Sequence, residues 1–141
     1  MNGETGKLKK YAPVALRTGI AIVFLWFAFS QIKNAGSWTR MIPSYVTSIV
    51  PFSSNTLVYM NAAFEIIFAS LLLVGLYTRL ASGLLTLHLL HIVTILGYGP
   101  TGVRDFSLVI ATLSIFLAGA DEFCLDRLIG RSEVKEIITR V

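Results

Sequence analysis

The chain has 141 residues and a formal net charge of +4, and 55% of its residues are hydrophobic whereas only 14% are charged. Its mean hydropathy of +0.72 excludes an ordinary soluble domain, because such domains carry about 25% charged residues and a chain this short has little interior for so much apolar surface. The charged residues crowd the two ends and the gaps between long apolar runs, as in polytopic membrane proteins, and no nucleic-acid-binding motif is present.

Four apolar runs are long enough to cross a bilayer, and we expect each of them to form a helix. They cover about residues 13–32, 56–76, 79–96 and 103–120. A helix needs roughly 20 residues to cross the hydrocarbon core, and a helix satisfies its own backbone polar groups there. The sequence therefore predicts an all-α, four-helix transmembrane bundle that forms one membrane domain over residues 1–141.

The first run begins at Pro13 and follows the basic stretch "KLKK", so its flank is similar to that of a secretory signal peptide. It is longer than the apolar region of a typical signal peptide, and no clear small-x-small cleavage site follows it. Proline also suits the first turn of a helix. We therefore expect a transmembrane helix that is retained in the protein.

The longest connection, residues 33–55, contains the stretch "MIPSYVTSIV". Its apolar residues recur at helical spacing, namely Ile42, Tyr45, Val46 and Ile49. With Trp38 alongside, this pattern predicts either a short helix in the membrane interface or a loop that packs over the mouth of the bundle.

Two later segments lie outside the predicted spans. The run "GYGPTG", residues 97–102, is rich in glycine and proline and predicts a loop. The tail of residues 121–141 is expected to lie in the cytoplasm, with Ser132 able to cap a helix. Its apolar stripe consists of Val134, Ile137, Ile138 and Val141. The stripe indicates docking on a partner or on lipid headgroups, and a frayed terminus is the alternative.

The basic residues predict the orientation of the bundle. Four spans place both termini and the turn after the second span on one side, together with Lys7, Lys9, Lys10, Arg17, Arg79, Arg127, Arg131, Lys135 and Arg140. The other side holds Lys33, Arg40 and Arg104. By the positive-inside rule, both termini lie in the cytoplasm. Cys124 is the only cysteine and would lie on the same side.

Every predicted span contributes polar residues to the half of the bundle that faces outward. They are Gln31, Lys33, Asn61, Glu65, His88, His91, Arg104 and Asp105. Charged groups at this depth are costly and usually face the bundle interior, where they pair with one another. One interpretation is a structural clasp in which Glu65 pairs with a histidine, Arg104 or Lys33.

The other interpretation is a ligand or proton-relay site that opens toward the outer leaflet. Its candidate residues are Glu65, His91, His88, Asn61, Arg104 and Lys33. We expect no metal there, although Glu65, His88 and His91 contain the ingredients of a two-histidine, one-carboxylate metal site. A bis-histidine haem is disfavoured because both histidines share one helix face.

The ordered set of segments resembles the DoxX-like family of small four-helix membrane proteins. The resemblance rests on "LWFAFSQIKN", on "FEIIFASLLLVGLYTR", on the histidine-bearing third span and on "RDFSLVIATLSIFLAGADEFCLD". It extends from Arg17 to Asp126. The residues that match the family by position are Lys33, Glu65, Arg79, His91 and Asp126, and the resemblance gives them no established role.

The resemblance implies a multi-pass protein of a prokaryotic plasma (inner) membrane. The family takes its name from a small subunit of an archaeal terminal quinol oxidase related to thiosulfate:quinone oxidoreductase, and other members are thought to accompany redox or sulfur-stress partners. The implied partner is therefore a larger membrane redox complex, and the implied ligand is quinone.

Two classes of function follow from these observations. The first is a redox-associated subunit in which His91 donates to a quinone carbonyl and Glu65 relays a proton. The second is a non-catalytic accessory or assembly subunit whose polar cluster is purely structural. A transporter is disfavoured because no internal repeat is visible. The sequence carries no cofactor-binding motif, so we expect no intrinsic cofactor and no catalysis by this chain alone.

Overall fold

The computed structural model describes residues 8–130, and four of its helices are long and apolar enough to cross a membrane. They are α2 (Tyr11–Lys33), α5 (Ser54–Val74), α6 (Thr78–Leu96) and α7 (Pro100–Ala118). No strand occurs within the described residues. The predicted all-α bundle of four membrane-spanning helices is confirmed.

Some helix ends differ from the predicted spans because local chemistry sets the boundary. α5 begins after Ser53, whose side chain accepts a hydrogen bond from the Thr56 amide at 3.2 Å. α5 ends at Gly75, which adopts a left-handed φ of 72° that glycine tolerates. The predicted loop at 97–102 is too long, because Pro100 already forms the first turn of α7. Its fixed φ and missing N–H suit that position.

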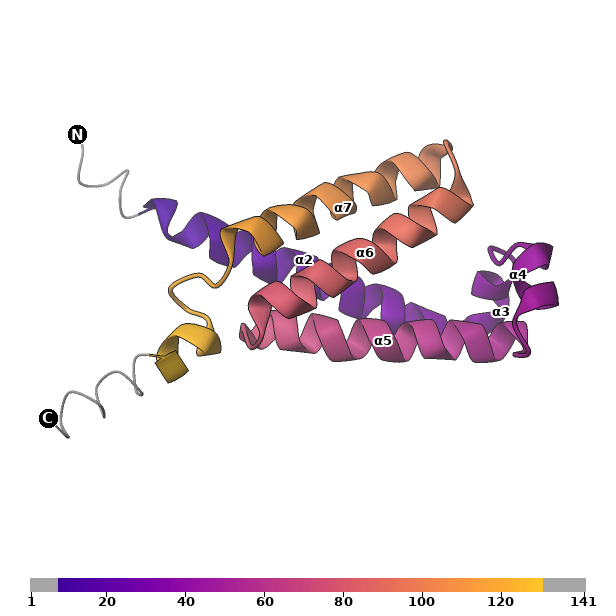
Figure 1. Cartoon of the computed structure of the whole chain (residues 1–141), viewed down its shortest axis with the longest axis horizontal. Helices are drawn as coiled ribbons and strands as arrows, with labels where there is room; N and C mark the ends of the chain where they lie inside the picture. The colour runs from indigo at the N-terminus through magenta and orange to yellow at the C-terminus, as the bar shows by residue number, and fades with distance from the viewer. Residues whose placement is uncertain (1–7, 131–141) are drawn as a thin grey trace, which may run out of the picture.

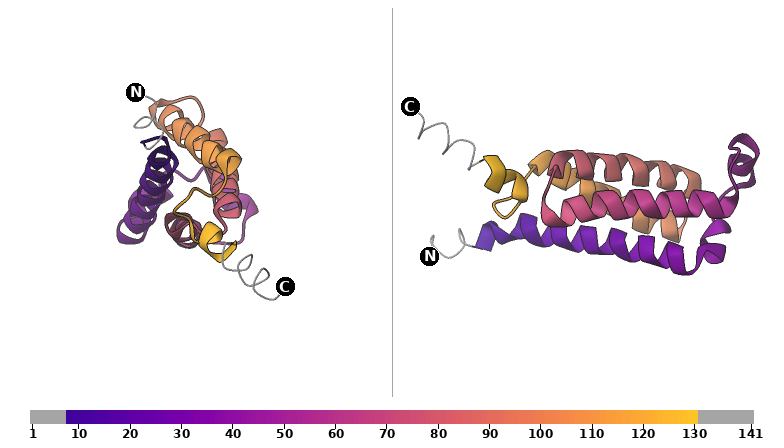
Figure 2. Two further views of the ribbon diagram at one scale, coloured as in Figure 1. Left: turned by 90° about the vertical axis from the view of Figure 1, so that its left-hand side faces the viewer. Right: turned by 90° about the horizontal axis from the view of Figure 1, so that it is seen from below.

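The long helices pack as two antiparallel pairs, α2 with α5 and α6 with α7 (Figures 1 and 2). Contacts of α5 with α6 and of α2 with α7 join the pairs into one bundle. α2 buries Ala21 and Ala28 completely, and α5 does the same with Ala62 and Ala69. Each of these pairs is spaced by two helical turns. Small residues at such positions let membrane helices approach closely.

The outward faces of the long helices are also apolar. Exposed large side chains on them include Ile22, Trp26, Ile67, Leu87, Phe106 and Leu117. Contiguous apolar surface of this extent is unusual on a soluble monomer, and lipid chains cover it in a membrane. The predicted contact with the lipid bilayer is therefore confirmed by the spans that the structure contains.

The connection between α2 and α5 forms two short helices, α3 (Ala35–Thr39) and α4 (Ser44–Ile49). The first of these was not expected, whereas the second is the short helix that the sequence offered as one of two alternatives. Its apolar stripe is divided between two environments, because Val46 is partly buried over the mouth of the bundle while Tyr45 and Ile49 are 55% and 78% exposed. The stretch therefore forms a short helix that also packs over the mouth of the bundle, and its location in the membrane interface stays a prediction.

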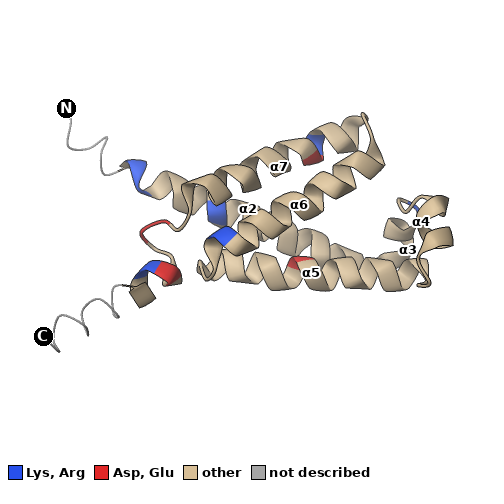
Figure 3. Ribbon diagram, viewed as in Figure 1, with Lys and Arg blue, Asp and Glu red and all other residues tan. Residues whose placement is uncertain are grey.

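The bundle has two ends that differ in charge (Figures 1 and 3). The Cys124 end comprises the first turn of α2, the α5–α6 turn and residues 119–130, whereas the α4 end comprises α3, α4 and the α6–α7 turn. Most of the lysine and arginine positions drawn in Figure 3 lie toward the Cys124 end. The start of α2 and residues 121–130 share one end, as four spans require. The predicted stripe from Val134 to Val141 lies outside the described residues.

The cytoplasmic location of the Cys124 end stays a prediction, and Cys124 itself cannot report it. Its side chain is completely buried beneath Gly75, where any Cβ would collide with it. Burial also raises the pKa of the Cys124 thiol, and the thiolate is the reactive form.

Cysteines introduced at exposed positions should report the orientation instead. With an impermeant maleimide, Thr47→Cys at the α4 end should react in intact cells or spheroplasts. Glu122→Cys at the Cys124 end should react only after lysis. The unmodified protein serves as the control and should label slowly unless it is denatured. The reverse pattern for the two introduced cysteines would place the Cys124 end outside.

Candidate functional site

A cavity of about 480 Å³ lies at the α4 end, between the four long helices and the α3–α4 connection. Its walls are mainly apolar and include the aromatic side chains of Trp26, Phe27 and Trp38. The polar residues that line it are Gln31, Asn61, Glu65, His88, His91, Arg104 and Asp105. Small-molecule sites are typically apolar cavities of about 300–1,000 Å³ with a few converging polar groups, and this cavity has that form.

Glu65 of α5 is 3% exposed and is held by two amide side chains. Gln31 Nε2 of α2 donates to Glu65 Oε2 at 2.8 Å, and Asn61 Nδ2, one turn earlier on α5, donates to Glu65 Oε1 at 3.0 Å. Asn61 Nδ2 also donates to Gln31 Oε1 at 2.8 Å. The three side chains, called the Glu65 cluster below, tie α2 to α5. Their hydrogen bonds offset part of the cost of burying a carboxylate.

His88 of α6 lies beside the Glu65 cluster without joining it. Its Nε2 atom is 3.7 Å from Glu65 Oε1, which is too far for a hydrogen bond. The ring packs against Phe64 with 4.6 Å between the ring centroids. His88 Nε2 is buried and has no hydrogen-bond partner among the described residues. Buried polar atoms are rarely left without a partner, so this nitrogen is an unsatisfied polar atom in the cavity wall.

Arg104 of α7 contacts Asp105 and Phe27 and makes no bond with Glu65 among the described residues. Its Nε donates to Asp105 Oδ1 at 2.7 Å, and its guanidinium lies over the Phe27 ring at 5.5 Å. Trp38 meets the same Phe27 ring edge-on at 6.0 Å. The contact between Arg104 and Phe27 closes one side of the cavity wall by a cation–π interaction between α2 and α7.

The structure brings together some of the predicted site residues and separates others. Glu65 and Asn61 are hydrogen-bonded, and His88 is adjacent to them. His91 and Arg104 line the cavity but make no hydrogen bond or ion pair with Glu65 among the described residues. Lys33 is exposed and does not line the cavity. The candidate site is therefore narrower than the predicted set.

Gln31 is missing from the predicted set although it supplies the bond between α2 and α5. A signal was present in the sequence, because Phe24, Ala28 and Gln31 lie on one buried stripe of α2 at spacings of three and four residues. Lys33 lies two residues beyond Gln31 and therefore faces outward. Continuing the apolar stripe along α2 would have identified the glutamine instead of the lysine.

The described part of the chain contains no group of side chains arranged to bind a metal ion. Between residues 8 and 130, no group of three or more His, Cys, Asp or Glu side chains is close enough to share one ion. The combination of Glu65, His88 and His91 is thus not brought together as a metal site there.

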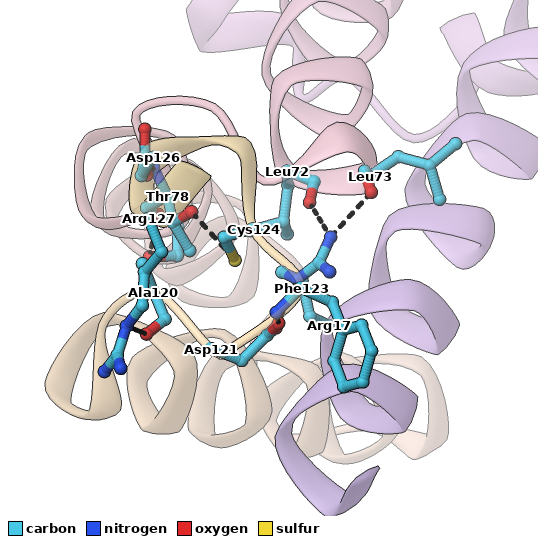
Figure 4. Close-up of polar contacts among 11 residues, drawn as sticks. Arg17, Leu72, Leu73, Thr78, Ala120, Asp121, Phe123, Cys124, Asp126 and Arg127 are labelled. Atoms are coloured by element: carbon cyan, nitrogen blue, oxygen red, sulfur yellow. Dashed lines mark hydrogen bonds and ion pairs between the residues drawn. The ribbon is translucent and has the colours of Figure 1, made fainter. Parts of the chain in front are cut away.

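A second buried polar cluster lies at the Cys124 end (Figure 4). Arg17 Nε of α2 donates to Asp121 Oδ2 at 2.6 Å, and its Nη1 donates to the carbonyls of Leu72 and Leu73 at 2.8 and 2.6 Å. Burial alone would raise the pKa of Asp121, but the hydrogen bonds from Arg17 and the Phe123 amide outweigh it, and the pKa lies below its usual value. In the sequence analysis, Arg17 is only one of the basic residues that predict the orientation. In the structure it is buried and links α2 to the end of α5 and to the segment after α7.

A family model described as DoxX matches residues 12–98, which is more than half of the chain. The chain belongs to the DoxX family. The matched residues run from α2 to just beyond the end of α6, so they include the Glu65 cluster and His88 and leave α7 outside. The comparisons with curated proteins and with solved structures gave no match.

In this DoxX-family protein, the segment after α7 is fastened to the start of α6 by Asp126. Asp126 Oδ1 accepts from the Tyr77 amide at 2.7 Å, and Oδ2 accepts from the Thr78 amide at 2.8 Å. The Asp126 amide donates to the Gly75 carbonyl at 3.0 Å. These bonds cap α6 and hold Tyr77 at a φ of 49°, which is uncommon for a residue other than glycine.

The Asp126 cap predicts a pH dependence of stability. Burial alone would raise the pKa of Asp126, but hydrogen bonds from Thr78 and Tyr77 outweigh it and hold the pKa below its usual value. A depressed pKa in the folded state adds stability that is complete above the ordinary value of about 3.9 and is lost as the pH falls toward the folded pKa. Below about pH 4, the melting temperature of the parent should therefore fall more steeply than that of Asp126→Asn.

Melting curves followed by circular dichroism between pH 7 and pH 3 would test this expectation. Glu122→Gln is the matched control, because Glu122 is exposed, and its profile should follow that of the parent. Parallel profiles for the parent and Asp126→Asn would contradict the cap.

Proposed function

We propose that this DoxX-family protein is a membrane subunit associated with a quinone-linked redox system, and that the cavity at the α4 end holds a quinone head group. The observation that carries the proposal is His88, which lines the cavity and whose buried Nε2 atom has no hydrogen-bond partner among the described residues. A quinone offers carbonyl oxygens that accept hydrogen bonds on a flat apolar ring. The cavity offers the complement of both features, namely a hydrogen-bond donor on His88 and flat apolar walls.

The walls of the cavity suit such a ring. Trp26, Phe27 and Trp38 provide flat apolar surfaces, and aromatic rings stack favourably against one another. The volume of about 480 Å³ lies within the range of small-molecule sites. A prenyl tail can leave through the apolar surface of the bundle into lipid.

The polar residues have separate roles in this proposal. His88 donates to a quinone carbonyl, and the neighbouring Glu65 is the group nearest to His88 that can exchange a proton with it. Gln31 and Asn61 hold the Glu65 carboxylate in place by hydrogen bonds. A bound quinone supplies the electron-accepting chemistry, and a partner subunit exchanges the electrons.

The intrinsic fluorescence of the protein provides a direct test, because both of its tryptophans line the cavity. We expect decylubiquinone to quench the fluorescence of the purified protein along a saturable curve. His88→Phe keeps a ring against Phe64 and removes the donor, so it should weaken binding at least about tenfold, as expected for losing a hydrogen bond to a buried polar partner.

The matched control is Thr94→Val on the same helix. Thr94 is exposed, bonds to the His91 carbonyl of its own helix and does not line the cavity, so this variant should bind like the parent. Melting temperatures would establish that each variant is folded. Linear, unsaturated quenching that is identical in all three proteins would show collisional quenching only and would refute the proposed site.

A second function, an accessory or assembly subunit without a ligand, is favoured by one specific observation. The Glu65 carboxylate already accepts bonds from both Gln31 and Asn61, so it needs no ligand to be stabilised. In that case the Glu65 cluster only fixes α2 against α5, and the protein serves by holding a partner complex together. Co-purification of the same partner with the parent and with a quinone-binding-deficient His88→Phe variant would support this function.

A further inference from the structure

A second cavity, of about 500 Å³, lies at the Cys124 end and is distinct from the cavity at the α4 end, called the quinone cavity below after its proposed ligand. It is formed where the start of α6, the end of α7 and the following segment meet. We call it the Arg79 cavity, and its lining includes the side chains of Arg79, Leu80, Asp126 and Arg127. The function proposed above leaves it without a role.

The Arg79 cavity is rich in unpaired positive charge. The Arg79 side chain makes no hydrogen bond or ion pair with any other residue between 8 and 130. Arg127 donates from Nε to the Ala120 carbonyl at 3.1 Å, and its side chain makes no other hydrogen bond or ion pair within the described residues. Asp126 is the one acidic residue in the lining, and both of its oxygens are occupied by the amides of Tyr77 and Thr78. Two guanidinium groups therefore face the cavity without an acidic partner.

The position of Arg79 depends on a glycine. Gly119 ends α7 with a φ of 76°, and a Cβ there would lie 2.8 Å from Arg79 Nε. Arg79 can lie across the end of α7 because Gly119 has no side chain. The chain thus leaves space for a guanidinium at this point, although no other group of the described residues binds it.

The cavity also lies at one end of two helices that are long and apolar enough to span a membrane, where the bilayer would meet water. α6 begins at Thr78 and α7 ends at Ala118, so the arginines lie at the ends of two membrane-spanning helices. Leu80 and Leu117 next to them are 57% and 67% exposed and would face lipid chains. A ligand that fits these surroundings has a negative charge at the interface and an apolar portion in the bilayer.

We propose that the Arg79 cavity binds the phosphate headgroup of an anionic phospholipid. Guanidinium groups bind phosphate through paired, charge-assisted hydrogen bonds, and basic pockets between membrane helices bind anionic headgroups. The exposed leucines contact the acyl chains of the same lipid. This site is independent of the quinone cavity, which lies at the opposite end of the bundle.

Native mass spectrometry of the detergent-solubilised full chain, titrated with phosphatidylglycerol or phosphatidylcholine, tests the proposal. The parent should retain one phosphatidylglycerol roughly 30-fold more tightly than phosphatidylcholine, because two arginines contribute. Each arginine near a membrane surface contributes roughly a fivefold gain in affinity for anionic lipid. Arg79→Gln should therefore lose about fivefold, and Arg79→Gln with Arg127→Gln roughly 30-fold. Arg79→Lys with Arg127→Lys keeps both positive charges and should keep most of the preference for phosphatidylglycerol.

Arg40→Gln is the matched control, because Arg40 is an exposed arginine at the opposite end of the bundle, and it should bind both lipids like the parent. Arg79→Gln removes no bond between described residues, so it decides the question even if the double variant fails to fold. Equal retention of the two lipids by the parent, or an unchanged preference in Arg79→Gln, would overturn the proposal. Inorganic phosphate that raises the melting temperature as much as phosphatidylglycerol does would assign the cavity to a free anion and overturn the lipid as its occupant.

Discussion

Replacing Arg17 by methionine should lower the free energy of unfolding by about 3–5 kcal/mol, the usual cost of removing one partner of a buried ion pair. The side chains of Arg17 and Asp121 are only 5% and 3% exposed, so solvent does not screen the charge that remains. The same substitution takes the donor from the carbonyls of Leu72 and Leu73 at the end of α5. Equilibrium unfolding by sodium dodecyl sulfate in mixed micelles, followed by circular dichroism, measures the change.

Three further variants separate the ion pair from general effects of charge at the Cys124 end. Arg127→Met removes an exposed arginine and should change the free energy of unfolding by less than about 0.5 kcal/mol. Arg17→Lys should be intermediate, because a single ammonium cannot reproduce the planar guanidinium fork. Arg17→Met with Asp121→Leu should recover much of the loss, since no unpaired charge remains buried. If Arg17→Met were as stable as Arg127→Met, the stabilising role assigned to the buried ion pair of Arg17 with Asp121 would be wrong.

Glu65→Leu should destabilise the bundle by about 1–3 kcal/mol for each buried amide that loses its acceptor. The amides at risk are those of Gln31 and Asn61, which both donate to the carboxylate. Glu65→Gln should cost less, because its carbonyl oxygen still accepts one of the two bonds. The same micelle titration measures stability, and tryptophan quenching by decylubiquinone measures binding.

The double variant Gln31→Leu with Glu65→Leu distinguishes a clasp from a ligand site. It removes Glu65 together with the Gln31 amide that donates to it, so we expect it to regain the part of the stability that Glu65→Leu loses through Gln31. Asn61 still lacks its acceptors in this variant, so the recovery should be incomplete. We also expect it to bind quinone more weakly than the parent, because the carboxylate that lies 3.7 Å from His88 Nε2 is gone. Glu122→Leu at an exposed position is the control and should leave binding unchanged. A stable double variant that binds like the parent would leave the Glu65 cluster with a structural role only.

The number and the approximate ends of the membrane-spanning helices are determined by the sequence alone. Hydrocarbon requires a long apolar run whose backbone satisfies itself, and four such runs are visible without any knowledge of their packing. Local chemistry fixes several boundaries as well, since Gly75 ends α5 and Pro100 starts α7. These signals act within one or two turns of the chain, which is why they can be predicted. The short helix α3 lacks such a signal and was not predicted.

The partners of the buried polar groups were decided only by the tertiary structure. The sequence offers Glu65 several partners at matching depth, and the rotation of each helix selects Gln31 and Asn61, leaves His88 adjacent and turns Lys33 outward. Arg17 and Asp121 are 104 positions apart, and each belongs to a segment with no periodic relation to the other. Their pairing depends on how α2, α5 and the segment after α7 pack together. A hydrogen bond requires two atoms within about 3 Å, and the spacing of residues along the chain does not tell which distant segments come that close.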